Sequence, residues 1–173
     1  MGFARLGGGR TSLIVDAAAP ARGPASVQAH ASTLAFELTS GRRPLIVSCG
    51  SGASFGADWR RAGRATPSHS ALVLDGGSSA RLSGDAHHPD WLSDAPRHVP
   101  VTLSRTARGT RFEGAHDGYL AGHGLTHVRK LDLSADGRAL AGEDMLLAVE
   151  EADRRRFDRT RHASYPRGVP FEI

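Results

Sequence analysis

The sequence predicts an all-β fold, an antiparallel β-sandwich, and three observations support this prediction. The chain contains 21 glycines and 9 prolines, enough to supply many turns. Apolar and polar residues alternate over several short segments, which is the period of a strand with one face in a core. Aromatic residues make up only 6% of the chain, so that core must rest on leucine, valine, isoleucine and alanine. A chain of 173 residues is normally one domain.

The first half of the chain is predicted to form two hairpins. Three consecutive glycines, residues 7–9, separate the first two β segments, and Gly41 separates the next two. Leu34, Phe36 and Leu38 alternate with smaller or polar residues, as in a half-buried strand. Strands are therefore expected over residues 3–6, 12–15, 34–38 and 44–50, with loops over 16–27 and 50–66 and a further strand near His69.

The second half is predicted to continue the sandwich after a polar loop over residues 76–100. The cluster Asp85–Asp90 in this loop contains two histidines, but Pro89 and the high polarity favour a solvated loop over a metal site. Residues 125–133 alternate clearly, yet neither face is fully apolar, so we expect this strand at a sheet edge. Further strands are expected over residues 99–104, from Tyr119 onward, and over 140–149 after the Asp136-Gly137 turn.

The domain is placed at residues 1–149. Residues 150–173 are expected to be a charged connector, a solvated loop, followed by the start of a further strand at Phe171. The first six residues lack the charged start and apolar run of a signal peptide and read as a strand already under way. Both ends therefore resemble cuts inside a larger protein.

Composition excludes several classes of function. The net charge is +4, and all but one of the basic residues are arginine, whose fork pairs well with carboxylate, sulfate or phosphate. No stripe of interleaved basic and aromatic residues indicates a nucleic-acid partner, and no segment is apolar and long enough to span a membrane. The single cysteine, Cys49, excludes an intrachain disulfide and is expected to be buried.

Five consecutive segments of the chain resemble a known family in order and spacing. They are Gln28–Ser32, Phe36–Leu38, Val47–Gly50, Trp59–Ala65 and Ser68–Gly76. Together they resemble the heparinase II/III-like family, in the C-terminal, supersandwich-like β-sandwich domain of certain polysaccharide lyases. The resemblance continues loosely through residues 116–119 and 125–130.

The resemblance implies a function for a longer protein, of which this chain is a fragment. Such lyases cleave uronate-containing glycans by β-elimination, which needs the uronate carboxylate neutralised, a base for the C5 proton and an acid for the leaving oxygen. Relatives place their main catalytic residues on an α-helical toroid that precedes the sandwich, so the catalytic residues are unknown here. The implied partners are an acidic polysaccharide and that N-terminal helical domain, and the implied location is the periplasm or cell envelope.

The resemblance also implies a zinc ion, with ligand positions at His30, Ser48 and His69. From the residues alone, His30 and His69 each precede a predicted strand, where their side chains can converge. Ser48 stands where the family has an aspartate, and Gln28 stands where it has a histidine, so both departures remove chemistry. We therefore predict zinc at His30 and His69, with a structural polar cluster as the alternative.

Four further residues are candidates for substrate binding: Arg60, Arg61, Arg64 and Tyr119. The arginines can meet glycan carboxylates, or they can belong to a solvated loop. Tyr119 can line a cleft, or it can pack inside the sheet. Two alternatives to the lyase interpretation stay open, a non-catalytic carbohydrate-binding module and a purely structural sandwich domain.

Overall fold

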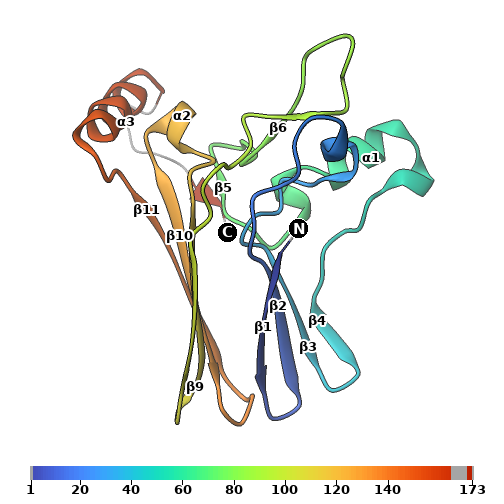
Figure 1. Ribbon diagram of the computed structural model, residues 1–173, viewed down its shortest axis with the longest axis vertical. Coiled ribbons are helices and arrows are strands. Elements are labelled where there is room, and N and C mark those ends of the chain that lie inside the picture. Colours follow the sequence, from blue (N-terminus) through green and yellow to red (C-terminus); the bar gives the residue numbers. More distant parts are fainter. Residues whose placement is uncertain (1, 165–170, 173) are drawn as a thin grey trace.

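The computed structural model describes residues 2–164 and 171–172 and consists mainly of two four-stranded antiparallel sheets (Figure 1). The first sheet has the order β1-β2-β3-β4, with β1 Phe3–Gly8, β2 Thr11–Asp16, β3 Phe36–Ser40 and β4 Arg43–Ile46. The second has the order β11-β10-β9-β8, with β8 Val101–Thr106, β9 Gly109–His116, β10 Thr126–Ser134 and β11 Leu140–Leu147. The predicted all-β sandwich is confirmed.

The core lies between these sheets and follows from the alternation of apolar residues. Leu6 and Leu13 are opposite each other on β1 and β2, and both are fully buried. Each leucine removed from water in this way stabilises the fold by about 1.5–3 kcal/mol. The buried cluster that joins the two sheets comprises Leu6, Leu13, Val15, Leu34, Phe112, Leu131 and Leu133.

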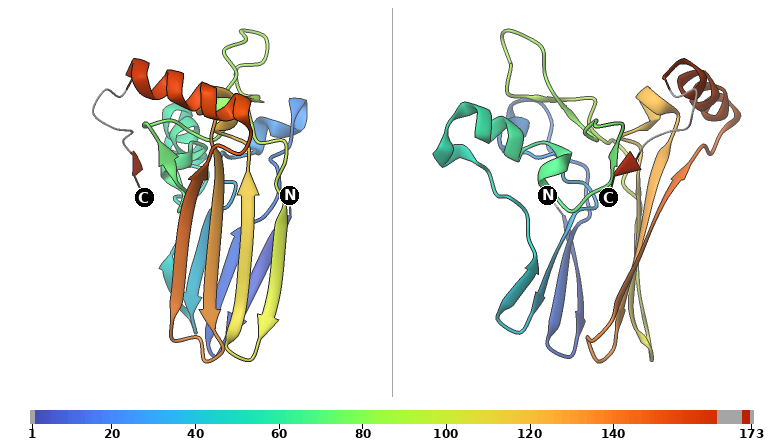
Figure 2. Two further views of the ribbon diagram at one scale, coloured as in Figure 1. Left: turned by 90° about the vertical axis from the view of Figure 1, so that its left-hand side faces the viewer. Right: turned by 180° about the vertical axis from the view of Figure 1, so that it is seen from behind.

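The remaining elements lie at one end of the sandwich, and the hairpin turns lie at the other (Figures 1 and 2). A second buried cluster, formed by Leu72, Leu74, Tyr119 and Leu125, fills this end. The elements are η1 Gly23–Gln28, η2 Ala53–Phe55, α1 Ala57–Gly63, η3 Thr66–Ser68, β5 Val73–Leu74, β6 Arg81–Leu82, β7 Leu92–Ser93, α2 Leu120–His123, α3 Glu151–Ser164 and β12 Phe171–Glu172. Strand β12 pairs with β5, and β6 pairs with β7.

Two segments expected to be loops are helical. In α3, Glu151 and Asp153 lie in the first turn and Arg161 in the last, an order that complements the helix dipole. Phe157 packs against the second core cluster, which fixes the helix to the domain. The segment expected to be irregular after Gly50 contains α1, which begins directly after Gly56.

Three expectations about single positions are wrong. The strand expected at a sheet edge is β10, which lies between β9 and β11 because its buried polar residues find partners on those strands. Tyr119 does not resume the sheet, since it caps the N-terminus of α2. Cys49 is exposed, because the chain has left β4 at Ile46 and passes over no core there.

Candidate functional site

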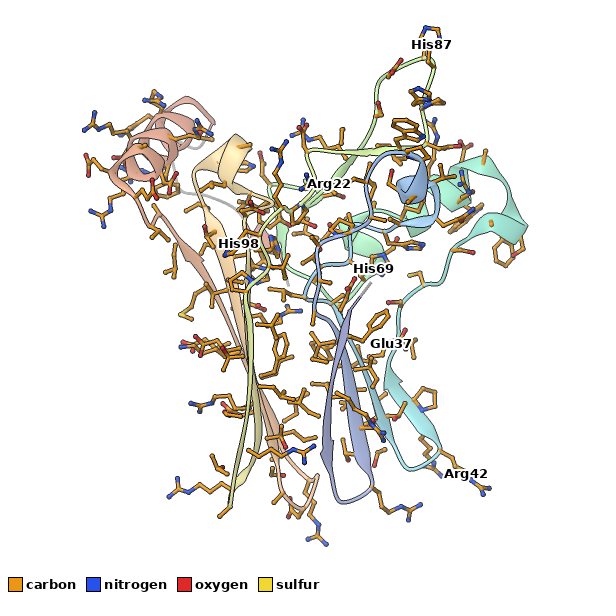
Figure 3. The ribbon with its side chains drawn as sticks, viewed as in Figure 1. Arg22, Glu37, Arg42, His69, His87 and His98 are labelled. Carbon is orange, nitrogen blue, oxygen red and sulfur yellow. The ribbon has the colours of Figure 1, made fainter. Side chains whose placement is uncertain are left out.

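The structure brings His30 and His69 together, as predicted. His30 follows η1, and His69 follows η3, so two short helical turns deliver both rings to the end of the first sheet. The Nδ1 atom of His30 lies 3.3 Å from the Nε2 atom of His69. The ring planes are inclined at 62°, an edge-on arrangement in which the two nitrogens face each other. His69 lies just beyond the strand that carries Glu37 (Figure 3).

Ser48 completes a short polar chain on the far side of His69. Its hydroxyl lies 3.1 Å from His69 Nδ1. The backbone N–H of Ser48 donates to the carboxylate of Glu37 at 3.2 Å. The segment after β4 is thereby held against β3, and the hydroxyl of Ser48 is oriented toward the imidazole ring.

These side chains open into a pocket of about 480 Å³. Its polar groups are hydroxyls, an amide, the two imidazoles and the carboxylates of Asp16 and Glu37. The Ser32 hydroxyl donates to Asp16 at 2.7 Å, while burial raises the pKa of Asp16 above its usual value. The lining residues are Phe3, Ile14, Asp16, Gln28, His30, Ser32, Ala35, Phe36, Glu37, Ser48, Gly50, Ser51 and His69.

Burial keeps both imidazoles neutral. Burial lowers the pKa of His69, repulsion from a protonated His30 ring adds to this, and together they bring it to about 4. The pKa of His30 is also lowered, chiefly by burial and then by the positive charge of Arg64. At neutral pH the pair therefore offers unprotonated ring nitrogens that can accept a proton or hold a metal ion.

The two histidines match only part of a zinc site. Nitrogen ligands about 2.0–2.1 Å from a tetrahedral zinc lie about 3.3 Å apart. The observed separation of 3.3 Å matches that value. Catalytic zinc, however, has three protein ligands. Residues 2–164 and 171–172 contain no group of three His, Cys, Asp or Glu side chains that could hold a metal ion together. The donor set therefore does not fit a complete zinc site.

The three candidate arginines lie in very different places. Arg64 is 2% exposed, and its guanidinium donates to the carbonyls of Ala29 and Ser26 at 2.8 Å each. Arg60 is half-buried, donates to the Val27 carbonyl and pairs with Asp90 at 3.2 Å. Arg61 is exposed. Of the three, only Arg61 presents its charge freely to solvent, and Arg64 instead fixes the backbone next to His30.

Tyr119 also lies inside the protein rather than in a cleft. It is 2% exposed, and its hydroxyl donates to the Leu72 carbonyl at 2.5 Å. Burial raises the pKa of the phenol well above its usual value. Its position supports packing of α2 against the strand β5, and it does not line the His30–His69 pocket.

Comparison with known proteins identifies the family. A family model described as "Heparinase II/III-like, C-terminal" matches residues 1–169. The chain belongs to this family. The chain is also 37% identical over 150 residues to FtsZ-localized protein C of Caulobacter vibrioides (strain NA1000 / CB15N), which covers 84% of this chain. The match spans 25% of that relative's own length. No solved structure gives a significant match.

The two residues that depart from the heparinase II/III-like pattern, Gln28 and Ser48, both line the pocket. Ser48, at the family aspartate position, still contacts a site histidine, but it brings a neutral hydroxyl. Gln28, at the first family histidine, is exposed and lines the same pocket as His30. Among the described helices, none is long and apolar enough to cross a bilayer.

Sequence reasoning missed one buried polar network in the second sheet. The backbone N–H of Gly118 donates to Nδ1 of His116 at 3.0 Å, so the ring proton of His116 lies on Nε2. That nitrogen faces Nδ1 of His127 at 3.1 Å, and Nε2 of His127 lies 2.7 Å from Asp144. Arg129 pairs with the same carboxylate. The available signal was the placement of His127 and Arg129 on the leucine face of residues 125–133.

Arg129 connects this network to the first half of the chain. Its Nη1 donates to the Leu34 carbonyl at 2.8 Å and to the Ser70 carbonyl at 2.5 Å. Its guanidinium carbon lies 5.5 Å from the centre of the Phe36 ring. Phe36 lines the pocket, so Arg129 fixes both the backbone and one wall of the candidate site.

Proposed function

We propose that this domain is the glycan-binding β-sandwich wall of a longer heparinase II/III-like protein. The observation that carries the proposal is the chain from His30 through His69 to Ser48, which opens into the pocket. Sugars bind through their hydroxyls, and the pocket offers imidazole, amide and hydroxyl partners for them. Phe3, 64% exposed at the pocket edge, offers an apolar surface for a sugar ring.

The charges of the pocket bear on the kind of glycan. Asp16 and Glu37 contribute carboxylates, and the two imidazoles are neutral, so the pocket itself has no cation to pair with a uronate. An acidic polysaccharide would therefore need its carboxylates neutralised by residues outside this pocket. In our proposal those residues belong to an N-terminal helical domain of the same protein.

A second candidate is β-elimination by that longer protein, and the neutral imidazole pair favours it. A base with a free lone pair removes the proton from C5 of a uronate, the C4–O bond breaks, and a C4–C5 double bond forms. The departing oxygen takes a proton from an acid. In this candidate His30 and His69 carry the proton transfer, with the carboxylates of Asp16 and Glu37 in the same pocket as further acid–base groups.

The test uses two measurements on the same variants. Binding of neutral and uronate-containing oligosaccharides is measured by calorimetry for the wild type, His30→Ala and His69→Ala, with His87→Ala on an exposed loop as control. Glycan binding that is lost in His30→Ala and His69→Ala but kept in His87→Ala supports the proposal that this pocket binds glycan. Unchanged binding in all three overturns it.

The second measurement addresses catalysis. The absorbance of unsaturated uronate is followed with the longer protein and with the present chain. Activity in the longer protein that falls in His69→Ala supports the lyase candidate. Glycan binding without product in the longer protein supports a non-catalytic wall instead.

A location in the periplasm or cell envelope belongs to the same proposal. Its support is the family's relation to polysaccharides. Fractionation of cells that express the natural full-length protein tests it. Recovery with the envelope or periplasmic fraction is the expected result, and recovery with the cytosol alone contradicts it.

A further inference from the structure

The basic charge of the protein is concentrated at the hairpin end of the sandwich. The β1–β2, β3–β4, β8–β9 and β10–β11 turns all reach this end (Figures 1 and 2). Arg42 marks it in Figure 3, far from His69. Six exposed arginines in or next to the turns form what we call the basic platform: Arg10, Arg42, Arg43, Arg105, Arg108 and Arg138.

Hydrogen bonds between the turns make the platform one rigid surface. Gly41 N–H donates to the Arg10 carbonyl at 2.7 Å, which joins the two turns of the first sheet. Gly9 N–H donates to the Ala135 carbonyl at 3.1 Å, which joins the two sheets. Ala135 N–H in turn donates to the Arg108 carbonyl at 2.9 Å. All four turns are therefore fixed relative to one another.

Glycine is required for this close approach. Gly137 has φ +69°, and a Cβ there would lie 1.9 Å from the carbonyl oxygen of Gly8 on the other sheet. Thr11 adds a further link by donating from its hydroxyl to the Gly137 carbonyl at 2.7 Å. The arginines thus extend from a preorganised base, which reduces the entropy lost when they bind an anion.

The platform accounts for the net charge of the whole chain. Its six arginines face one carboxylate in the same turns, Asp136, an excess of five positive charges. The complete chain carries +4, so the rest of the molecule is slightly negative. In the part of the chain that the structure describes, the ion pairs involve none of the six arginines. Their charges are available to a partner.

The chemistry of the turns selects the partner. They contain no aromatic side chain to stack on a sugar ring or a base, which disfavours a glycan or a single-stranded nucleic acid. They contain no large apolar side chain to insert among acyl chains. The turns therefore present guanidinium groups, hydroxyls and glycine backbone at a protruding end of the domain. Guanidinium groups bind phosphate well, so this end suits an extended surface that bears phosphates.

We propose that the basic platform docks the protein end-on to a bilayer surface rich in anionic phospholipids. Clusters of four to eight basic residues bind such surfaces. Each basic residue in the cluster adds a similar share of the binding free energy through attraction to the headgroup phosphates. Docking by this end directs the opposite end, with the His30–His69 pocket, away from the bilayer. The contact is peripheral and electrostatic, so it weakens as salt is raised.

The test is cosedimentation of the purified protein with vesicles. Vesicles of phosphatidylcholine with phosphatidylglycerol are compared with vesicles of phosphatidylcholine alone. The variant Arg42→Gln/Arg43→Gln/Arg108→Gln is expected to bind the anionic vesicles on the order of a hundredfold more weakly than the wild type. The matched control Arg22→Gln/Arg97→Gln/Arg159→Gln removes the same charge from exposed positions outside the platform and is expected to keep at least most of the affinity.

Circular dichroism and thermal unfolding establish that both triple variants are folded. Equal loss of binding in the platform variant and the control overturns the proposal, because it would report net charge alone. So does equal binding of the wild type to both kinds of vesicle. Binding to soluble polyglutamate or heparin without binding to anionic vesicles assigns the platform to a soluble polyanion and also overturns it.

Discussion

Asp144 lies directly opposite Arg129 in the pairing of β11 with β10, and the two form a bidentate ion pair. Arg129 Nε and Nη2 donate to the two carboxylate oxygens at 2.7 Å each. Arg129 is 4% exposed and also donates to the carbonyls of Leu34 and Ser70. One carboxylate therefore compensates the charge of an arginine that joins the second sheet to the backbone beside the candidate site.

Removing that carboxylate charge is expected to destabilise the domain strongly. Asp144→Asn leaves the buried guanidinium of Arg129 without its counter-charge, and the expected loss is about 3–5 kcal/mol of unfolding free energy. The matched control is Asp132→Asn. Asp132 accepts from Arg111 at 2.7 and 3.0 Å, but both side chains are about half exposed, so the expected loss is below about 1 kcal/mol. Urea denaturation measures the unfolding free energy of both variants. Equal losses would contradict the conclusion that Asp144 compensates the buried charge of Arg129.

Stability is expected to fall as the pH falls from about 6.5 toward 4. Burial lowers the pKa of His69 to about 4 and that of His116 to about 3, from 6.5 in the unfolded chain. Between these values the unfolded state binds the proton and the folded state does not, so acid favours unfolding. Each histidine contributes at most about 1.4 kcal/mol per pH unit.

The variant His69→Gln isolates one part of this dependence. It removes one titrating group, so the slope of unfolding free energy against pH should become shallower than in the wild type. The same measurement on His87→Gln, on an exposed loop, is the control for removal of a histidine outside the pocket. A His69→Gln slope equal to that of the wild type would show that this ring does not contribute.

Local patterns in the sequence predicted the hairpins and the meeting of two histidines. Glycines at positions 9, 41 and 137 adopt positive φ, which is why these turns could be identified without knowing their partners. His30 and His69 precede β3 and β5 by a few residues, but these strands lie in different sheets. The two rings meet because hydrogen bonds join Ala31, next to His30, to Arg64 and Thr66 near His69. The turns depend on short stretches of chain, whereas the meeting of the two histidines depends on contacts between distant segments; the structure confirms both predictions.

Burial of polar residues could not be predicted in the same way. Arg64 belongs to a segment expected to be an irregular loop, yet its guanidinium bonds to a carbonyl more than thirty residues away in sequence. Tyr119 packs inside the protein, one of its two expected positions, but nothing in the sequence indicates its partner, the Leu72 carbonyl. The inner position of β10 likewise depends on Asp144 of the next strand. A polar side chain is buried when a distant partner satisfies it, and periodicity holds no information about that partner.

Arg64 is expected to act on stability, and through it on the pocket. Arg64→Met removes the guanidinium donor of the Ala29 carbonyl and one of the two donors of the Ser26 carbonyl, and the expected loss is about 1–3 kcal/mol. Arg61→Met changes an exposed neighbour and should stay within about 0.5 kcal/mol. Thermal unfolding gives both values. The NMR signals of the His30 ring should shift in Arg64→Met and not in Arg61→Met. Unchanged stability and unchanged His30 signals in Arg64→Met would contradict the conclusion that Arg64 fixes the backbone next to His30.

Zinc affinity tests whether the neutral side chain of Ser48 limits metal binding by His30 and His69. The wild type has two imidazoles at zinc spacing and a hydroxyl on Nδ1 of His69, so elemental mass spectrometry should find well below one zinc per chain. Ser48→Asp places a carboxylate against the same ring. Either as a third ligand or as the partner of a ligating histidine, it is expected to tighten zinc binding by at least about tenfold. Ser51→Asp, in the same pocket, controls for added charge and should bind no better than the wild type. Stoichiometric zinc in the wild type, lost in His30→Ala and His69→Ala, would instead show that the two histidines suffice.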